Sequence, residues 1–251
     1  MRPLRRSLTA AGIAAIAALA LAACATGALV EPDGADESVP GGTETEQVMI
    51  EAAWLDGGRS IGIVTEGSST CVPSAGEVTL ETNGTLAVTF EEPDATTPCT
   101  MDYAPRVSLV GVPDGVDPSQ NLTISVTGAG FDGGTTLTGV PGLTVDGESD
   151  MTPSAGWTNV NGTFVVLLWG SSTCTEHITA TEVTGAASVS ASLSGIPADK
   201  ACTADMAPNP VLAFADGLHG VEDVELTLTS HSADDLTFPI LGVNGPKTPI
   251  G

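Results

Sequence analysis

Positive charge is the scarcest property of this sequence. It contains 7 Lys and Arg residues against 31 Asp and Glu, which gives a formal net charge of −24. Beyond the first six positions only four fixed positive charges remain, namely Arg59, Arg106, Lys200 and Lys247. Nucleic acids, phosphate-rich ligands and anionic lipid headgroups are bound by clustered basic groups. The sequence therefore predicts no nucleic-acid partner, and it favours either cationic partners or an acidic surface that only maintains solubility.

Aromatic residues are also few, with three Trp, five Phe and one Tyr in 251 residues. Carbohydrate binding relies on exposed rings for stacking, so this class of function has little to draw on. Trp54 and Trp157 occupy equivalent places in a repeat described below, and Trp169 ends an apolar run. All three are interpreted as core residues.

Histidine occurs only at His177, His219 and His231, so general-base catalysis has few candidates. No Gly-x-Ser-x-Gly motif accompanies these histidines, and no serine or paired acid stands at a recognisable spacing from them. We therefore predict no catalytic residue, no enzymatic activity and no cofactor.

Carboxylates are plentiful enough to keep a metal site under consideration. Asp114 and Asp117 lie in a Gly-Pro loop, and Asp216, Glu222 and Asp223 lie in the corresponding loop of the second half. Calcium requires six to eight oxygen ligands from a suitably shaped loop. No EF-hand pattern is present, so the prediction is no metal site, with bound calcium as the alternative.

Long hydrophobic runs are missing except at the start of the chain. Arg2, Arg5 and Arg6 precede an uncharged stretch, 7–23, that is rich in Ala, Leu and Ile, which is typical of a secretory signal. The stretch ends in Leu-Ala-Ala followed by Cys24, which resembles a bacterial lipobox. We expect residues 1–23 to be removed and Cys24 to be fatty-acylated, for example with palmitate. A plain cleavable signal or an uncleaved membrane helix is the alternative.

Removal of residues 1–23 takes three arginines and no acid, so the net charge moves from −24 to −27. Residues 24–47 then follow, with six acids, no base, and many Gly, Pro, Ser and Thr residues. Such a composition does not bury enough apolar surface to fold. We expect an acidic disordered tether that joins the lipid to the rest of the chain.

The remainder of the chain is one module written twice at an offset of 103 residues. Gly-Ser-Ser-Thr-Cys, ending at Cys71, recurs letter for letter ending at Cys174. Cys-Thr-Met-Asp-Tyr-Ala-Pro from Cys99 returns as Cys-Thr-Ala-Asp-Met-Ala-Pro from Cys202. A repeat on this scale indicates two copies of one structural unit, which we place at 48–149 and 150–251. The 146–153 stretch marks the boundary between them.

The repeat selects one disulfide pairing. The four cysteines after Cys24 pair in three possible ways, but each copy carries its own pair with a spacing of 28 residues. We therefore predict the disulfides Cys71–Cys99 and Cys174–Cys202. Zinc is the alternative for these cysteines, but it requires closely spaced Cys or His ligands, and residues 24–150 contain no histidine. Disulfides also suit a compartment outside the cytoplasm.

Each copy has the pattern of an all-β domain. The 60–66 and 163–169 stretches are short apolar runs rich in β-branched residues, which favour central strands. Asn83-Gly84 stands between alternating apolar positions and predicts a hairpin within 77–90. Six or seven short strands per copy favour two tandem β-sandwich-like or small barrel modules. A short polar link between the copies gives them little reason to share a core.

The repeated Ser, Thr and Asp residues next to the cysteines are interpreted as framework. Small hydroxyl residues cap turns, and Asp102 and Asp205, each three residues past a cysteine, are expected to accept hydrogen bonds from nearby backbone amides. Repeated identities are what a shared scaffold preserves. Positions that differ between the copies are where a function is expected to have diverged.

The pattern Gly-Ser-Ser-Thr-Cys followed by Cys-Thr-x-Asp-x-Ala-Pro resembles uncharacterised tandem-repeat secreted lipoproteins of high-G+C Gram-positive bacteria. The resemblance covers the chain from about Met49 to its end and agrees with the lipobox at Cys24. It implies a location on the extracytoplasmic face of the cell membrane. It implies no activity and no functional residue.

These features together favour a lipid-anchored cell-surface protein that binds a protein or another envelope component without catalysis. Tandem modules gain avidity even when each binds weakly. An envelope hydrolase using carboxylates and a purely structural spacer are the alternatives. The hydrolase would require two carboxyl groups that converge in a cleft, with at least one displaced pKa.

Overall fold

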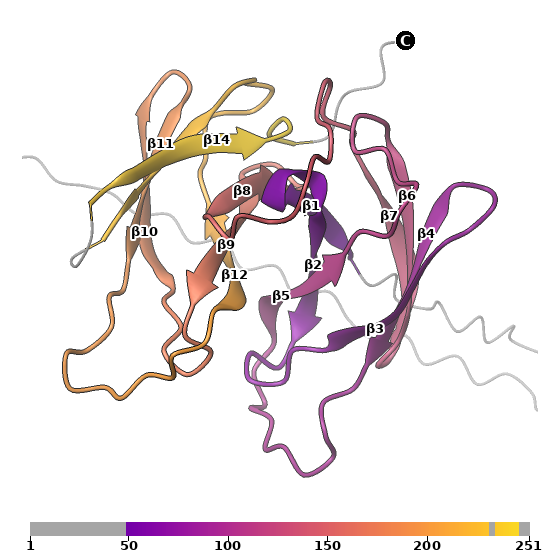
Figure 1. Cartoon of the computed structure of the whole chain (residues 1–251), viewed down its shortest axis with the longest axis horizontal. Helices are drawn as coiled ribbons and strands as arrows, with labels where there is room; N and C mark the ends of the chain where they lie inside the picture. The colour runs from indigo at the N-terminus through magenta and orange to yellow at the C-terminus, as the bar shows by residue number, and fades with distance from the viewer. Residues whose placement is uncertain (1–48, 231–233, 246–251) are drawn as a thin grey trace, which may run out of the picture. The chain divides into compact units, whose positions relative to one another are not determined.

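The described part of the chain is built from β-strands and one short 3-10 turn, so the all-β prediction is confirmed. The computed structural model describes residues 49–230 and 234–245, which belong to one compact unit (Figure 1). No helix within these residues has the length and apolar character needed to cross a membrane.

The repeat in the sequence is also a repeat in the strands, with seven in the described part of each copy. The first copy contains β1 (Glu51–Leu55), η1 (Asp56–Gly58), β2 (Ser60–Gly67), β3 (Ser74–Leu80), β4 (Thr85–Glu91), β5 (Ala104–Gly111), β6 (Leu122–Gly128) and β7 (Phe131–Leu137). The second copy contains β8 (Ser154–Trp157), β9 (Thr163–Gly170), β10 (Ile178–Gly185), β11 (Ser188–Leu193), β12 (Ala207–Phe214), β13 (Glu225–Thr229) and β14 (Leu236–Leu241).

The strands of each copy pair in the same order. In the first copy they form a three-stranded sheet, β1-β2-β5, and a four-stranded sheet, β3-β4-β6-β7. The second copy has β8-β9-β12 and β10-β11-β13-β14, joined into one seven-stranded sheet because β14 pairs with β8. The β4–β6 and β11–β13 pairs are parallel, whereas the other pairs within each copy's sheets are antiparallel except β14–β8.

The two apolar runs become the central strands that the sequence predicts. β2 lies between β1 and β5, and β9 lies between β8 and β12. Consecutive residues of each run are buried, for example Ile63 beside Val64 and Val165 beside Val166. Side chains alternate between the two faces of a strand, so a continuous buried run means that both faces of the sheet are covered.

The predicted hairpin is present as β3 and β4. Gly84 adopts a positive φ of 86°, which glycine tolerates, and the Thr85 amide donates to Asn83 Oδ1 at 2.8 Å. Leu80 pairs with Leu86 and Val78 with Val88, so the apolar side chains of the two strands share a face as expected.

One face of each three-stranded sheet packs on the four-stranded sheet of the same copy. In the first copy, Trp54, Ile61 and Val110 pack against side chains of β4 and β6 such as Leu86 and Ile124. The second copy repeats this arrangement with Trp157 and Phe164 of the three-stranded sheet and residues of β11 and β13. The Trp157 and Phe164 rings meet edge to face with centroids 5.1 Å apart.

The opposite faces of the three-stranded sheets form a third core that belongs to both copies. It contains six buried residues, Ala53, Leu55, Val64 and Val107 of the first copy with Val165 and Leu167 of the second. A Cβ at Gly62 would lie 3.0 Å from Leu55 Cδ1 and 3.2 Å from Val165 Cγ1, so this glycine permits the close approach. The expectation that the copies lack a common core was therefore wrong.

Polar contacts add to this junction. Asn159 Oδ1 accepts a hydrogen bond from the Ala52 amide at 3.0 Å, and Asn159 Nδ2 donates to Thr135 Oγ1 at 3.0 Å. The side chain thus bridges β1 and β7, which do not pair, whereas their counterparts β8 and β14 do. Asn159 of the second copy therefore joins two strands of the first copy.

Candidate functional site

Both predicted disulfides are present. Cys71 is bonded to Cys99 and Cys174 to Cys202, with Cα–Cα distances of 5.4 and 5.5 Å. In each copy the first cysteine is buried and the second is exposed. Each bond therefore ties an exposed loop, 92–103 or 194–206, to the end of the three-stranded sheet. We call these segments the disulfide loops.

A network of hydroxyl groups and an aspartate holds the first disulfide loop. Ser68 Oγ lies 2.9 Å from Thr100 Oγ1, and the Thr100 amide donates to Thr70 Oγ1 at 3.0 Å. The Ser69 amide donates to Asp102 Oδ1 at 3.1 Å, as the sequence predicts for an aspartate at this place. The Thr100 hydroxyl also donates to Asp102.

The second copy reproduces the network almost bond for bond. Ser171 Oγ lies 2.8 Å from Thr203 Oγ1, the Thr203 amide donates to Thr173 Oγ1 at 3.1 Å, and the Ser172 amide donates to Asp205 Oδ1 at 3.2 Å. The repeated motif is therefore a repeated structural device, which fixes the loop beside its disulfide.

The network also keeps its aspartates ionised. Hydrogen bonds from Ser69 and Thr100 lower the pKa of Asp102 to about 2, and bonds from Thr203 and Ser172 lower that of Asp205 to about 2. A carboxylate with so low a pKa is a poor general acid or base near neutral pH. These hydroxyl groups bond to threonine and aspartate rather than to a histidine base, which agrees with a framework role.

The copies differ beside the network. In the first copy Arg106 Nη1 donates to the backbone carbonyls of Ser68 and Cys71, at 2.9 and 2.6 Å, and its guanidinium lies 6.0 Å from the centre of the Phe131 ring. The equivalent residue of the second copy, Asn209, donates instead to the Glu176 carbonyl at 2.9 Å. The Arg106 guanidinium therefore bonds within the first copy, and burial lowers its pKa from the ordinary value.

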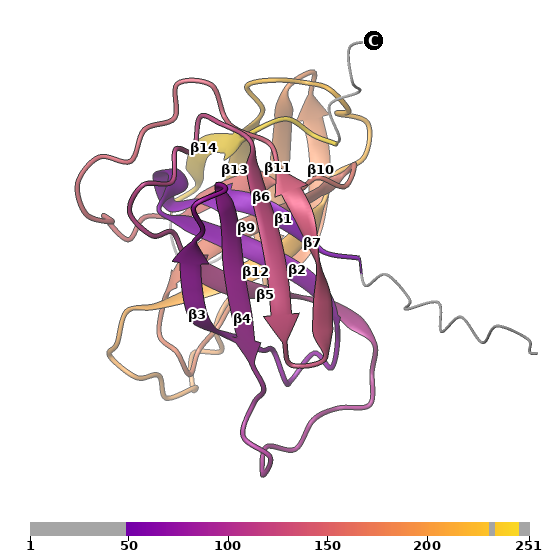
Figure 2. The same ribbon diagram turned by 90° about the vertical axis from the view of Figure 1, so that its right-hand side faces the viewer.

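The disulfide loops expose large apolar side chains that the sequence analysis did not single out. Met101 is fully exposed, Tyr103 is 76% exposed, and Met206, the counterpart of Tyr103, is 59% exposed. They flank the ionised aspartates. The signal was present in the repeat, because Met and Tyr next to a loop aspartate belong to no apolar strand. Figures 1 and 2 both show the two loops extending from the same end of the sheets.

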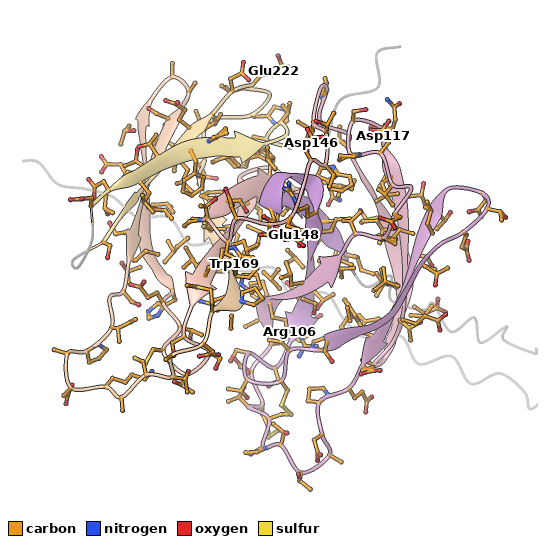
Figure 3. All side chains as sticks on the ribbon, viewed as in Figure 1. Arg106, Asp117, Asp146, Glu148, Trp169 and Glu222 are labelled. Atoms are coloured by element: carbon orange, nitrogen blue, oxygen red, sulfur yellow. A yellow bond between two sulfur atoms is a disulfide. The ribbon has the colours of Figure 1, made fainter. Side chains whose placement is uncertain are left out.

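The other candidate residues do not assemble into a reactive site. His177 and His219 are exposed, and His231 lies outside the described residues. Asp114 and Asp117 lie at the end of the sheets away from Arg106, where Figure 3 labels Asp117 and Glu222. Within residues 49–230 and 234–245, no three His, Cys, Asp or Glu side chains are arranged to hold a metal ion.

Glu51 is a carboxyl group whose pKa is raised. Burial raises it, a hydrogen bond from Thr158 Oγ1 at 2.7 Å opposes the shift, and Glu66 raises it further. Thr158 is itself buried and belongs to the second copy. The Glu51 side chain thus forms part of the contact between the copies, and it does not line the largest cavity described below.

The tryptophans take the core positions expected of them. Trp54 and Trp157 are 2% and 3% exposed, and Trp54 Nε1 donates to the Thr138 carbonyl at 3.0 Å. Trp169 is partly buried against the core shared by the copies. Residues 1–23, Cys24 and the tether up to residue 47 lie outside the described residues.

No protein-family model, curated protein or solved structure matches this chain.

Proposed function

We propose that the chain is a lipid-anchored protein of the extracytoplasmic membrane face that binds a partner through its two disulfide loops and performs no catalysis. Cys24 carries the lipid, residues 24–47 are the tether, and residues 48–149 and 150–251 are two β-sandwich-like modules. The separate cores between the three- and four-stranded sheets of each copy support the sandwich description.

The observation that carries this proposal is the exposure of Met101 and Tyr103 in one disulfide loop and of Met206 in the other. Single exposed apolar residues are common, but exposed apolar residues that lie close together mark interaction sites. Met101 and Tyr103 stand two positions apart in one exposed loop. Tyr is enriched among the residues that dominate binding energy, and Met adapts to irregular surfaces. The hydroxyl–aspartate network and a disulfide fix the loop backbone next to Met101, Tyr103 and Met206, so little backbone entropy is lost when a partner binds.

The charge of the chain defines the partner class. Asp102 and Asp205 stay ionised beside the apolar side chains, and the chain as a whole has a net charge of −24. Such a surface repels nucleic acid and a second copy of itself, and it attracts a basic protein surface. Two loops at one end of the molecule provide two contact points, which strengthens binding through effective concentration.

The anchor is tested by Cys24→Ser. This change should abolish fatty-acid labelling and move the protein from the membrane fraction to the medium. Retained label, or retention in the membrane fraction without label, would contradict the proposed anchor.

The docking surface is tested by photo-crosslinking in intact cells. A photoreactive amino acid at Tyr103 or Met206 should give one reproducible covalent partner with a basic surface. The matched control is Phe214, which is 55% exposed but lies outside both loops. The same partner captured from Phe214 in equal yield would mean that the loops have no special role.

A further inference from the structure

The largest cavity described in the structure lies in the first copy and is distinct from the disulfide loops. It is an open cleft of about 540 Å³, which falls within the roughly 300–1,000 Å³ of small-molecule sites. The 58–59 turn, the 112–118 loop and the 143–145 segment line it. Figure 3 places Asp117 and Asp146 at this end, opposite Arg106.

Packing and backbone hydrogen bonds within the protein fix the walls of the cleft. A Cβ at Gly58, where φ is 87°, would lie 3.0 Å from Pro118 Cγ and 3.4 Å from Val145 Cγ2, so this turn packs tightly against both walls. The Val112 amide donates to the Arg59 carbonyl at 2.9 Å, and the Val140 amide donates to the Pro118 carbonyl at 2.9 Å. These contacts fix the loop to the frame of the sheets.

The one cationic side chain of the lining is directed at the protein itself. Arg59 Nε donates to the Gly147 carbonyl at 3.2 Å, Nη1 donates to the Asp56 carbonyl at 3.0 Å, and Nη2 donates to the Asp146 carbonyl. Each nitrogen of the guanidinium therefore has a backbone acceptor. An anionic ligand would have to compete with these bonds.

The acids of the lining remain available as charges. Asp117 Oδ1 accepts bonds from the Ser119 hydroxyl at 2.7 Å and the Ser119 amide at 2.9 Å, and these bonds lower its pKa. Asp114 is exposed on the same loop. Val112, Val116 and Leu143 add apolar side chains to the lining.

From this combination we propose that the cleft binds an organic cation, an alkylammonium group attached to an apolar body. The ammonium group lies by Asp114 and Asp117, and the apolar body packs on Val112, Val116 and Leu143. A free amine and a lysine side chain of a peptide share this chemistry. The second copy has Gly162 in place of Arg59, so this part of the cleft belongs to the first copy alone.

The test is an NMR titration of the full chain, followed through the amide signals of Gly115, Val116 and Thr144. The probes are cyclohexylmethylammonium, its neutral analogue cyclohexylmethanol, the anion cyclohexanecarboxylate, and a blocked Gly-Lys-Gly peptide, all at one ionic strength. At least one ammonium probe should bind about tenfold more tightly than the alcohol, because the lining carries two carboxylates against one guanidinium. The tighter of the amine and the peptide identifies the source of the cation.

Variants separate the charge from the shape of the cleft. Asp114→Asn with Asp117→Asn should weaken ammonium binding by about tenfold and leave alcohol binding unchanged. Asn at 117 keeps an oxygen for the Ser119 bonds. Glu182→Gln with Glu225→Gln removes the same charge from the second copy and should have little effect. Equal binding of cation and alcohol, no saturable shift at millimolar probe, or no effect of the Asp changes would each overturn the proposal.

Discussion

Leu86→Ala tests whether the two copies unfold as one unit. Leu86 is fully buried in the core between the two sheets of the first copy. Truncation of a buried leucine costs about 2–5 kcal/mol, a large part of the roughly 5–15 kcal/mol by which domains are stable. The core shared by Leu55, Val165 and Leu167 couples the copies, so we expect the second copy to lose the same stability.

Amide hydrogen exchange read by mass spectrometry resolves the two copies. The slowest amides of β4 and of β11 should both exchange at least about 30-fold faster in Leu86→Ala, since each 1.4 kcal/mol is a factor of ten. Leu226→Ala, at a fully buried position of the second copy, provides the reciprocal variant and should accelerate exchange in β4. Acceleration confined to the mutated copy would refute the coupling and restore two independent modules.

Three further predictions concern the disulfides and the carboxylates. Peptide mapping without reduction should find Cys71 joined to Cys99 and Cys174 joined to Cys202, and a disulfide between the copies would contradict this. The double variant Cys71→Ala with Cys99→Ala should lose roughly 3–4 kcal/mol of unfolding free energy, the chain-entropy value for a loop of about 29 residues. Asp102 has a pKa of about 2 against an ordinary 3.8, so its charge stabilises the fold above pH 3.8 and this contribution is lost as pH falls through 2. Asp102→Asn should therefore weaken the dependence of stability on pH between those values, and Asp199→Asn removes the same charge outside the network as the control. Because burial raises the pKa of Glu51, ionising this carboxyl group destabilises the folded state, and stability is lost as pH rises through that pKa. Glu51→Gln should therefore raise the melting temperature at pH 7 and not at low pH. A lower melting temperature at pH 7 would show that the charge is favourable.

The strands and the disulfides were predictable because both depend on local patterns. The apolar runs at Ile63–Val64 and Val165–Val166 became central strands, and Asn83-Gly84 became a hairpin. The cysteine pairs followed from the identical spacing of two copies. Each of these features depends on residues that lie within a few positions of one another or within one copy of the repeat.

The core common to both copies was missed for a physical reason. A run that is buried on both faces says that something covers the second face, but it does not say what. Val165 and Leu167 point to the first copy, and Gly62 allows that approach. These are contacts between distant segments, which no local pattern specifies.

The candidate docking surface was missed for another reason: Met101, Tyr103 and Met206 are positions that differ between the copies, and they were not distinguished from the other differing positions. Asp102 is indeed framework, since it bonds Ser69 and Thr100. Its neighbours Met101 and Tyr103 face solvent. The loop backbone determines which of these adjacent side chains bonds within the protein and which faces solvent, and no periodic pattern in the sequence predicts it.

Co-sedimentation of the Cys24→Ser protein with envelope fragments of its own cells tests the central claim most directly. Binding should be saturable, should weaken with added salt, and should fall by at least about tenfold when Met101, Tyr103 and Met206 are all changed to Ser. The matched control changes three exposed apolar residues outside the loops, Val183, Phe214 and Leu236, to Ser and should bind like the unmodified chain. Equal losses in the two triple variants, or no saturable binding by the unmodified chain, would contradict docking through the disulfide loops.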